Sequence, residues 1–264
     1  MDFILAFIAA IGRKALGIIR ELGSFFLFAC RGLAHIISLP FQWSKITGQI
    51  YFIGVKSISV IALIGLFTGM VLGLQGYYTL VKFGAEGLLG AAVSLSIIRE
   101  LGPVLTAIMI AGRAGSAMAA EIATMRISEQ IDALNAMDVN PVRYLASPRF
   151  AASIVSFPLL TALFDVIGIA GGYLTGVMML GVNPGAYFAR INDSVVLGDV
   201  SGGFAKSLVF ALLVAGICCY EGYYAHRRPD GYGARGVGLA TTSAVVVSSV
   251  AILTADYALT SYLL

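Results

Sequence analysis

The sequence predicts an all-α membrane protein in which an N-terminal interfacial amphipathic helix precedes about five transmembrane helices. The 264 residues are 59% hydrophobic and 12% charged, whereas about 25% of the residues in a typical soluble domain are charged. Five apolar runs are long enough to cross a bilayer, which takes about 20 residues. The basic residues gather in every second segment that flanks or connects these runs, and therefore on one side of the membrane, as they do in membrane proteins.

The five candidate spans carry few charges. They are the runs 57–81, 87–112, 150–180, 203–220 and 236–255. The second contains Arg99 and Glu100 near its middle, the third contains Asp165, and the fourth contains Lys206. The third run is longer than a straight crossing needs, which predicts that it tilts or extends beyond the membrane.

Residues 1–40 form a different kind of segment, with cations at near-helical spacing and many Phe and Ile residues. Such a helix prefers the membrane interface, where its cations meet lipid phosphates. We expect Pro40 to end it. A sixth span over 22–39 is the alternative, and Arg31 and His35 weaken it.

The distribution of Lys and Arg predicts the orientation. Six precede the first span, four lie between the second and third, and three lie between the fourth and fifth, whereas the opposite side has Lys82 and Arg190. Positive residues mark the cytoplasmic side. We therefore expect a cytoplasmic N-terminus and a C-terminus on the outer side.

The charges inside the second span predict a polar pocket. Arg99 and Glu100 point about 100° apart on a helix, so they cannot pair well with each other. Glu100 shares a stripe with Ala107, so it faces other helices. Gly102–Pro103 follows, a pair that kinks a helix and frees main-chain carbonyls. A purely structural ion-pair network is the alternative to a pocket.

Small residues recur every four positions in three of the spans, which predicts closely packed helices. They include Gly65, Gly69 and Gly73 in the first span and Gly168, Gly172 and Gly176 in the third. Asp165 shares the face of the second set, so we interpret it as an interhelical hydrogen-bond acceptor. Cys218 and Cys219 lie in an apolar run, where helix packing is their simplest role.

A cytoplasmic segment, 126–148, lies between the second and third spans. Ser128 is a candidate N-cap, and Asn140–Pro141 a candidate stop. The apolar stripe of this short helix is Ile127, Ile131, Leu134 and Met137. An amphipathic helix offered to the cytoplasm can dock in a groove of a partner. Lying on the membrane is the alternative, and it would bring acidic side chains to anionic lipid.

Signatures of the common enzyme classes are missing. The sequence has no G-x-x-x-x-G-K-[ST] loop, no H-E-x-x-H motif and no G-x-S-x-G elbow. Gly231, Gly233 and Gly236 spell G-x-G-x-x-G, but in a basic loop between two spans rather than in a βαβ unit. We expect no catalytic residue, no metal, no cofactor and no nucleic-acid partner. The start of the chain lacks the basic n-region of a signal peptide.

Three segments resemble the MlaE family, the permeases of the Mla (maintenance of lipid asymmetry) ABC transporter of Gram-negative bacteria. They are GMVLGLQGY at 69–77, IRELGPVLTAIMIAGRAGSAMAAEIATMRISEQIDAL at 98–134 and SPRFAASIVSFPLL at 147–160. The resemblance covers nearly the whole chain and implies a single permease domain, 1–264, that moves phospholipid between the inner membrane and a periplasmic carrier or the outer membrane.

The resemblance also implies partners and sites. The partners are a second copy of the chain, cytoplasmic ABC ATPase subunits, a STAS-domain subunit, a periplasmic MCE-domain hexamer and phospholipid. By motif position, the lipid-binding residues are Arg99, Glu100, Lys206, Leu72, Gln75 and Leu101. The helix that couples to the ATPase carries Glu129, Ile131, Leu134 and Met137. The chemistry is consistent, because an anionic headgroup with apolar tails needs a few cations against an apolar wall.

Two other functions remain possible on the residues alone. An ion-coupled secondary transporter of a small amphiphile would use Glu100 and Asp165, but five unequal spans do not divide into inverted repeats. An intramembrane enzyme would need a nucleophile and a base, and neither His35 nor His226 lies in a span.

Overall fold

The computed structural model describes residues 2–36, 42–227 and 233–263, and these residues are almost entirely helical. The helices are α1 (Asp2–Ala34), α2 (Trp43–Ile53), α3 (Ile58–Leu80), α4 (Leu89–Ser96), α5 (Gly102–Ile110), α6 (Ser116–Ile127), α7 (Gln130–Ala136), α8 (Pro141–Tyr173), α9 (Pro184–Ser194), α10 (Leu197–Tyr223) and α11 (Gly233–Leu263).

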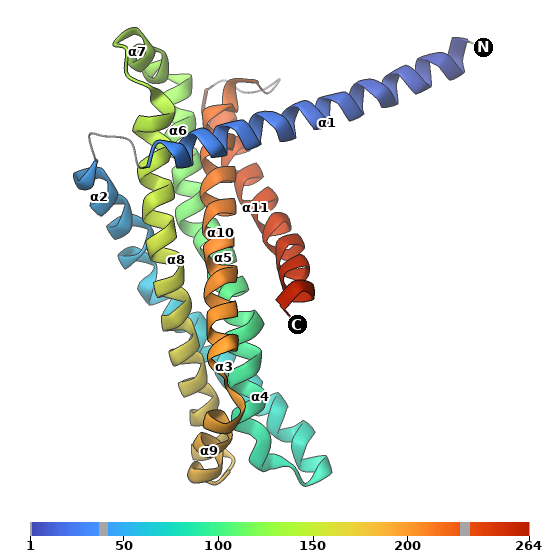
Figure 1. Cartoon of the computed structure of the whole chain (residues 1–264), viewed down its shortest axis with the longest axis vertical. Helices are drawn as coiled ribbons and strands as arrows, with labels where there is room; N and C mark the ends of the chain where they lie inside the picture. The colour runs from blue at the N-terminus through green and yellow to red at the C-terminus, as the bar shows by residue number, and fades with distance from the viewer. Residues whose placement is uncertain (1, 37–41, 228–232, 264) are drawn as a thin grey trace.

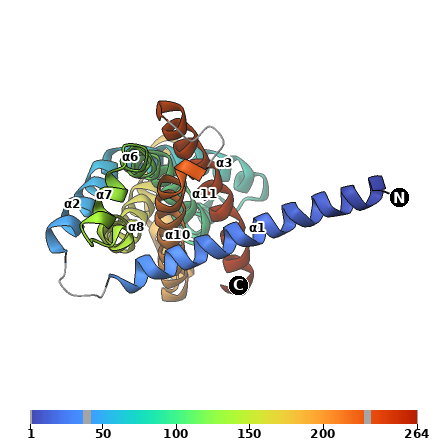
Figure 2. The same cartoon turned by 90° about the horizontal axis from the view of Figure 1, so that it is seen from above.

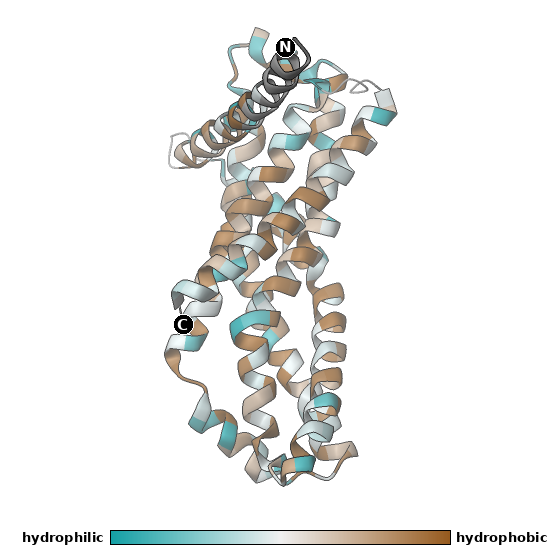
Figure 3. Cartoon of the chain, turned by 90° about the vertical axis from the view of Figure 1, so that its right-hand side faces the viewer, coloured by the Kyte–Doolittle hydropathy of each residue, from teal (hydrophilic) through white to brown (hydrophobic). Residues whose placement is uncertain are grey.

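Five stretches of the described chain are long and apolar enough to cross a membrane, as the sequence predicted. They are Trp43–Phe83, Glu86–Ile127, Pro141–Met179, Leu197–Tyr223 and Gly233–Tyr262. They pack side by side in one elongated bundle (Figure 1). Hydrophobic colours dominate its length, and hydrophilic ones are concentrated toward its two ends (Figure 3). The all-α membrane fold is therefore confirmed.

The predicted glycine stripes bring α3 and α8 together. Gly65, Gly69 and Gly73 are all buried on α3. A Cβ atom built on Gly69 would overlap the main-chain oxygen of Gly168, and one on Gly73 would lie 3.0 Å from the oxygen of Gly172. Only glycine allows two helix backbones to approach this closely, which is how membrane helices gain contact area.

Helix α1 lies across one end of the bundle, and its N-terminal part extends beyond α11 (Figures 1 and 2). Its C-terminal half is anchored. Phe28 is buried, Ser147 Oγ donates to the oxygen of Gly32 at 2.8 Å, and a Cβ on Gly32 would lie 2.6 Å from the ring of Phe150. This transverse course fits the interfacial helix that was predicted, and α1 is not one of the five spans. Pro40 lies outside the described residues.

The second span is not a continuous α-helix. π-helical turns occupy Ile97–Leu101 and Ala111–Gly115 and separate α4, α5 and α6. The first of these turns ends directly before Gly102–Pro103, where the sequence predicted an irregularity. A π-helical turn adds a residue to the helical turn, so it rotates the side chains that follow it relative to those before.

The end of the bundle opposite α1 is closed by α9 (Figure 1). Asn183 caps α9, because its side chain accepts a hydrogen bond from the N–H of Ala186 at 3.1 Å. Tyr187 is buried, and its hydroxyl donates to the oxygen of Ile169 on α8 at 3.0 Å. This burial raises the pKa of Tyr187 to about 12, so the hydroxyl remains a donor that fastens α9 to the bundle.

Candidate functional site

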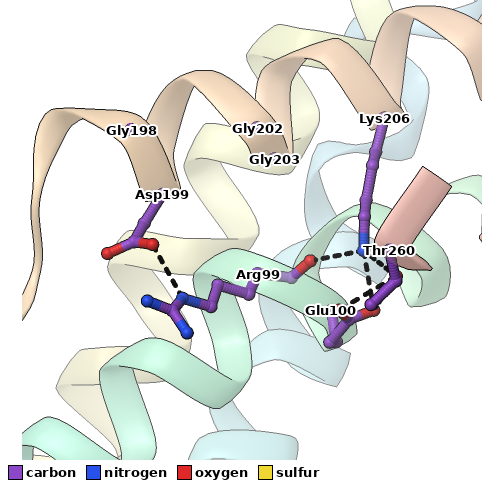
Figure 4. Close-up of a pocket in the computed structure, with 8 residues that line it drawn as sticks. All are labelled: Arg99, Glu100, Gly198, Asp199, Gly202, Gly203, Lys206 and Thr260. Carbon is purple, nitrogen blue, oxygen red and sulfur yellow. Dashed lines mark hydrogen bonds and ion pairs between the residues drawn. The ribbon is translucent and has the colours of Figure 1, made fainter. Parts of the chain in front are cut away.

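A polar pocket of about 300 Å³ lies within the spans, where the first π-helical turn meets the start of α10 and the end of α11 (Figure 4). Three helices far apart in sequence supply its walls. The lining residues are Arg99, Glu100, Gly198, Asp199, Gly202, Gly203, Lys206 and Thr260. The glycines are all on α10, and Gly203 lets this helix approach the π-helical turn closely, because a Cβ atom on it would lie 2.6 Å from the main-chain oxygen of Ile98.

Lys206 is the centre of the hydrogen-bond network. Its side chain is 2% exposed. Its Nζ lies 2.8 Å from Glu100 Oε2, 2.6 Å from Thr260 Oγ1 and 3.1 Å from Asp256 Oδ1. A buried ammonium needs such partners, because an unpaired charge in an apolar medium is very costly. One lysine therefore ties α10 to the π-helical turn and to α11.

Arg99 pairs separately, as the angle between neighbouring residues on a helix requires. Its Nε lies 2.7 Å from Asp199 Oδ1, and the other carboxylate oxygen of Asp199 accepts from the N–H of Val196 at 3.1 Å. The Asp199 carboxylate thus fixes Arg99 while it caps the first turn of α10.

Pro103 explains why Lys206 also reaches the main chain. In an α-helix the oxygen of Arg99 would accept from the N–H of residue 103, and proline has none. Lys206 Nζ donates to this oxygen at 2.9 Å. The sequence predicted that Gly102–Pro103 would free main-chain carbonyls. The carbonyl of Arg99 is one of them, and its oxygen accepts a hydrogen bond from the buried Lys206.

The structure therefore brings together three of the residues predicted to bind lipid. Arg99, Glu100 and Lys206 line one pocket, whereas Leu72, Gln75 and Leu101 are not among the residues that line it. Gln75 is exposed on α3, and Leu72 packs partly buried against the core. A lipid-binding role for all six stays a prediction.

Sequence reasoning missed Asp199, Asp256 and Thr260. Asp199 lies seven residues before Lys206, and therefore on the same face of α10. Asp256 directly follows the apolar run 236–255, and Thr260 lies one turn further on. Polar residues at these spacings inside an apolar helix were the signal that could have found them.

The interpretation of Asp165 as an interhelical hydrogen-bond acceptor was wrong. Within the part of the chain that the structure describes, its Oδ1 has no hydrogen-bond partner. The carboxyl packs against Gly102, where a Cβ atom would overlap Oδ1. Asp165 does face another helix, but its neighbour there is Gly102, whose main-chain N–H donates to the oxygen of Ile97 instead.

Both ends that the sequence predicted for the helix in the cytoplasmic segment need correction. Ser128 ends α6, with its Oγ donating to the oxygen of Thr124 at 2.8 Å, and Glu129 has φ +60° before α7 begins. Asn140 begins α8, accepting from the N–H groups of Val142 and Arg143, rather than ending the preceding helix.

Ile131 is fully buried and packs with α6 and α8, so it cannot take part in an exposed docking stripe. Glu129 is exposed, Leu134 is half-buried and Met137 is 64% exposed. Three of the four residues predicted for partner binding therefore reach the surface. Short α7 lies at the same end of the bundle as α1 (Figure 1).

Known proteins resemble this chain over almost its whole length. Residues 46–262 match the family model for "Permease MlaE". The chain belongs to the MlaE permease family. The family's protein of Haemophilus influenzae, "Intermembrane phospholipid transport system permease protein MlaE", is 41% identical over 98% of this chain and 97% of its own length.

Two further relatives are informative. A "Probable ABC transporter permease protein" of Rickettsia felis is 43% identical over 95% of both chains. The chloroplastic protein TRIGALACTOSYLDIACYLGLYCEROL 1 of Arabidopsis thaliana is 34% identical over 89% of this chain and 66% of its own length. The predicted MlaE resemblance is confirmed, and the chain is an ABC transporter permease rather than an ion-coupled transporter or an intramembrane enzyme.

Proposed function

We propose that this permease moves phospholipid between the inner membrane and a periplasmic carrier or the outer membrane, and that Arg99, Glu100 and Lys206 contact the lipid on its way. ATP hydrolysis by a separate subunit drives the movement. The name of the Haemophilus influenzae relative, an intermembrane phospholipid transport permease, supports the substrate.

The observation that carries the proposal is partial exposure of charges inside a span. The side chains of Arg99 and Glu100 are 41% and 39% exposed, although they lie near the middle of the apolar run 87–112. Charged groups do not face hydrocarbon, where each costs about 2.5–3.5 kcal/mol or more. They must therefore face water, a polar ligand or another subunit. A phospholipid phosphate suits Arg99, which keeps donors beyond the one it gives to Asp199.

The same exposure supports a homodimer. In a single chain the pocket is open enough to leave the side chains of Arg99 and Glu100 partly exposed. A second copy placed over this opening would enclose the charges and produce a cavity with polar and apolar walls. In such a dimer, exposed apolar residues of α3 and α11 would line the cavity or its rim; they include Phe67, Val71, Leu74, Leu253 and Tyr257. Leu72, Gln75 and Leu101 belong to the proposed lipid path as neighbours of this cavity.

Membership of the family supports the remaining partners that we propose. An ABC permease works with ABC ATPase subunits, and Glu129, Leu134 and Met137 near α7 offer a mixed charged and apolar surface to them. A STAS-domain subunit bound to the ATPases and a periplasmic MCE-domain hexamer on the opposite side complete the proposed complex. The N-terminus lies in the cytoplasm, because the basic residues concentrate at the end of the bundle that carries α1 and α7.

Transfer of labelled lipid tests the proposal. The permease is reconstituted with its ATPase and carrier subunits in liposomes that contain fluorescent phospholipid, and ATP-dependent loss of the label to the carrier is followed. Arg99→Ala and Glu100→Ala should each reduce transfer at least tenfold while the complex still assembles. Arg190→Ala, a change of the same type at an exposed position of α9, should not. Undiminished transfer by both pocket variants would assign these charges to packing.

A further inference from the structure

A second cavity, of about 770 Å³, lies at the end of the bundle that carries α1. Its volume is more than twice that of the pocket around Lys206. It forms where α1 crosses α10 and α11, and each of these helices contributes one face. The lining residues are Gly17, Arg20, Glu21, Ser24, Tyr220, Glu221, Tyr224, Arg227, Ser243 and Val247. None of them belongs to the site described above.

Side chains of both charges face this cavity. Arg20 and Arg227 are cationic, and Glu21 and Glu221 are anionic. The guanidinium of Arg227 stacks on the ring of Tyr224, with its central carbon 3.9 Å from the ring centroid. Stacking fixes the plane of a guanidinium and leaves its N–H edges able to bind phosphate. Two cations could hold a phosphate, while the carboxylates favour an ammonium group over a second anion.

Aromatic rings line the wall next to these charges. The ring centroids of Tyr220 and Tyr224 are 4.7 Å apart, and Ser24 Oγ and Tyr220 OH are 2.5 Å apart, which joins α1 to α10. Tyrosine is enriched where a membrane protein meets lipid headgroups, and ammonium groups bind to aromatic faces. The composition of this wall is therefore typical of the headgroup region of a membrane, which is where an interfacial helix such as α1 lies.

The cavity continues into an apolar surface on α11. Ser243 and Val247 line it, and Val250, one turn further along the same helix, is 60% exposed. A ligand with its polar end among the charges could therefore lay a hydrocarbon chain along α11 toward the middle of the bundle. A free phosphate ion would bury none of this apolar surface, whereas the acyl chains of a diacyl lipid would gain free energy by covering it.

We propose that this cavity between α1, α10 and α11 binds the headgroup of a zwitterionic phospholipid, with phosphate held by Arg20 and Arg227 and the amine held near Glu21, Glu221 and the tyrosines. The bound lipid fastens α1 to the bundle at the membrane surface. It is a resident of the interface, separate from the pocket around Lys206, and the proposal does not depend on the transport function.

Gly17 allows a sharp test, because a Cβ atom built on it meets nothing within 4 Å. A leucine at this position would extend into the cavity. Gly23 is on the same helix, is exposed, has the same empty surroundings and does not line the cavity. Gly17→Leu and Gly23→Leu therefore make the same chemical change with the same effect on helix propensity, and only the first occupies the site.

The experiment uses the full permease complex in nanodiscs that contain a photoactivatable phosphatidylethanolamine, with the labelled residues identified by mass spectrometry. In the native protein, labels should appear on 17–24 of α1 and 243–250 of α11. Gly17→Leu should reduce this labelling about fivefold or more, and Gly23→Leu should not. Arg20→Gln should also reduce it, in contrast to Arg31→Gln outside the cavity. Labelling elsewhere on the permease should be equal in all variants, which shows that they are folded.

Two competitors test whether the cavity binds a phospholipid rather than free phosphate, and whether it prefers a headgroup with an amine. Inorganic phosphate in millimolar excess should not displace the probe, and phosphatidylglycerol, which has no amine, should compete less well than phosphatidylethanolamine. Equal labelling of Gly17→Leu and the native protein would overturn the proposal, as would displacement by phosphate. A disulfide between one copy that carries only Gly17→Cys and another that carries only Val247→Cys would also overturn it, because a second chain would then fill the cavity. Lipid transfer through the Lys206 pocket is measured separately, so either proposal can fail alone.

Discussion

Lys206 on α10 donates a hydrogen bond to the main-chain oxygen of Arg99, 2.9 Å away, in place of the N–H that Pro103 lacks. The irregular second span and the buried lysine are thus parts of one arrangement. A proline leaves one carbonyl without a donor, and a charge from another helix supplies it. The same lysine binds Glu100, Asp256 and Thr260, so the position of α11 also depends on this irregularity.

Pro103→Ala should therefore change the pocket without disrupting the bundle. The alanine supplies an N–H to the oxygen of Arg99, which favours a regular α-helix and removes one partner of Lys206. We expect normal assembly and a several-fold loss of ATP-driven lipid transfer. Pro158→Ala, in α8, is the matched control and should transfer lipid normally. Equal transfer by both variants would mean that the backbone irregularity does not matter for the pocket.

Removal of the positive charge of the pocket should reduce assembly more than removal of a negative one. Lys206→Ala leaves Glu100 and Asp256 facing each other without a cation, and breaking a buried ion pair costs about 3–5 kcal/mol. Glu100→Ala leaves Lys206 paired with Asp256. We expect the yield of assembled complex to fall sharply for Lys206→Ala and little for Glu100→Ala, as measured by size-exclusion chromatography.

The double variant Lys206→Ala with Asp256→Asn should recover part of this yield, because one of the two opposed carboxylates is gone. Detergent sensitivity of cells, measured beside the yield, then separates packing from function. Replacing Arg99 and Glu100 together by leucine should leave cells sensitive even where the complex assembles. If that variant both assembles and protects cells, the charges serve only to hold the helices together.

The close approach of α3 and α8 gives a prediction about stability. Gly69→Ala places a methyl group on the main-chain oxygen of Gly168, and overpacking of this kind costs about 1–3 kcal/mol. We expect a lower midpoint of thermal unfolding in detergent. Gly48→Ala on α2, where a Cβ meets nothing within 4 Å, should leave the midpoint unchanged or raise it, since alanine favours the helix. Similar midpoints for the two variants would contradict the observed contact.

The spans and their packing could be predicted because they follow from local composition. A membrane span needs a minimum apolar length, and glycines four residues apart on α3 can only form a small-residue face. Cys218 and Cys219 are buried, as an apolar run implies. The transverse course of α1 could be predicted in the same way, because Arg31 and His35 would be costly within a bilayer.

The details of the site could not be predicted because they depend on how the helices are rotated. The face of Glu100 was inferred from a regular period of 3.6 residues, but a π-helical turn covers this residue and changes the register. Which neighbour Asp165 meets depends on the rotation of α8 against that turn. Ile131 was assigned to the outer stripe of α7, although a helix of seven residues has too few turns for the sequence to show which apolar side chain faces inward.

The orientation predicted from the basic residues can be measured with single cysteines. Asn135 lies on α7 and Asn192 lies on α9, which are at opposite ends of the bundle (Figure 1); both residues are exposed. In a background with Cys30→Ser, because Cys30 is exposed, Asn135→Cys should react with an impermeant maleimide only after the inner membrane is opened. Asn192→Cys should react in intact spheroplasts. The reverse pattern would place the N-terminus outside.

The surface around α7 gives the last prediction, which concerns the coupling to an ATPase. Met137 is 64% exposed, so Met137→Asp should leave the fold intact. An aspartate buried without a partner in a protein interface costs several kcal/mol, which should abolish recovery of the ATPase with the tagged permease. Leu134→Asp should have the same effect, with some loss of permease yield because Leu134 is half-buried.

Asn135→Asp is the control for this surface, since it adds the same charge to α7 at an exposed polar position. It should retain the ATPase if the contact depends on the apolar side chains. Ile131→Asp should instead lower the amount of folded permease, because Ile131 lies in the core formed with Leu145 and Phe150. Full recovery of the ATPase by Met137→Asp and Leu134→Asp would show that the partner docks elsewhere. The contrast between the buried and exposed positions distinguishes a lost contact from a lost fold.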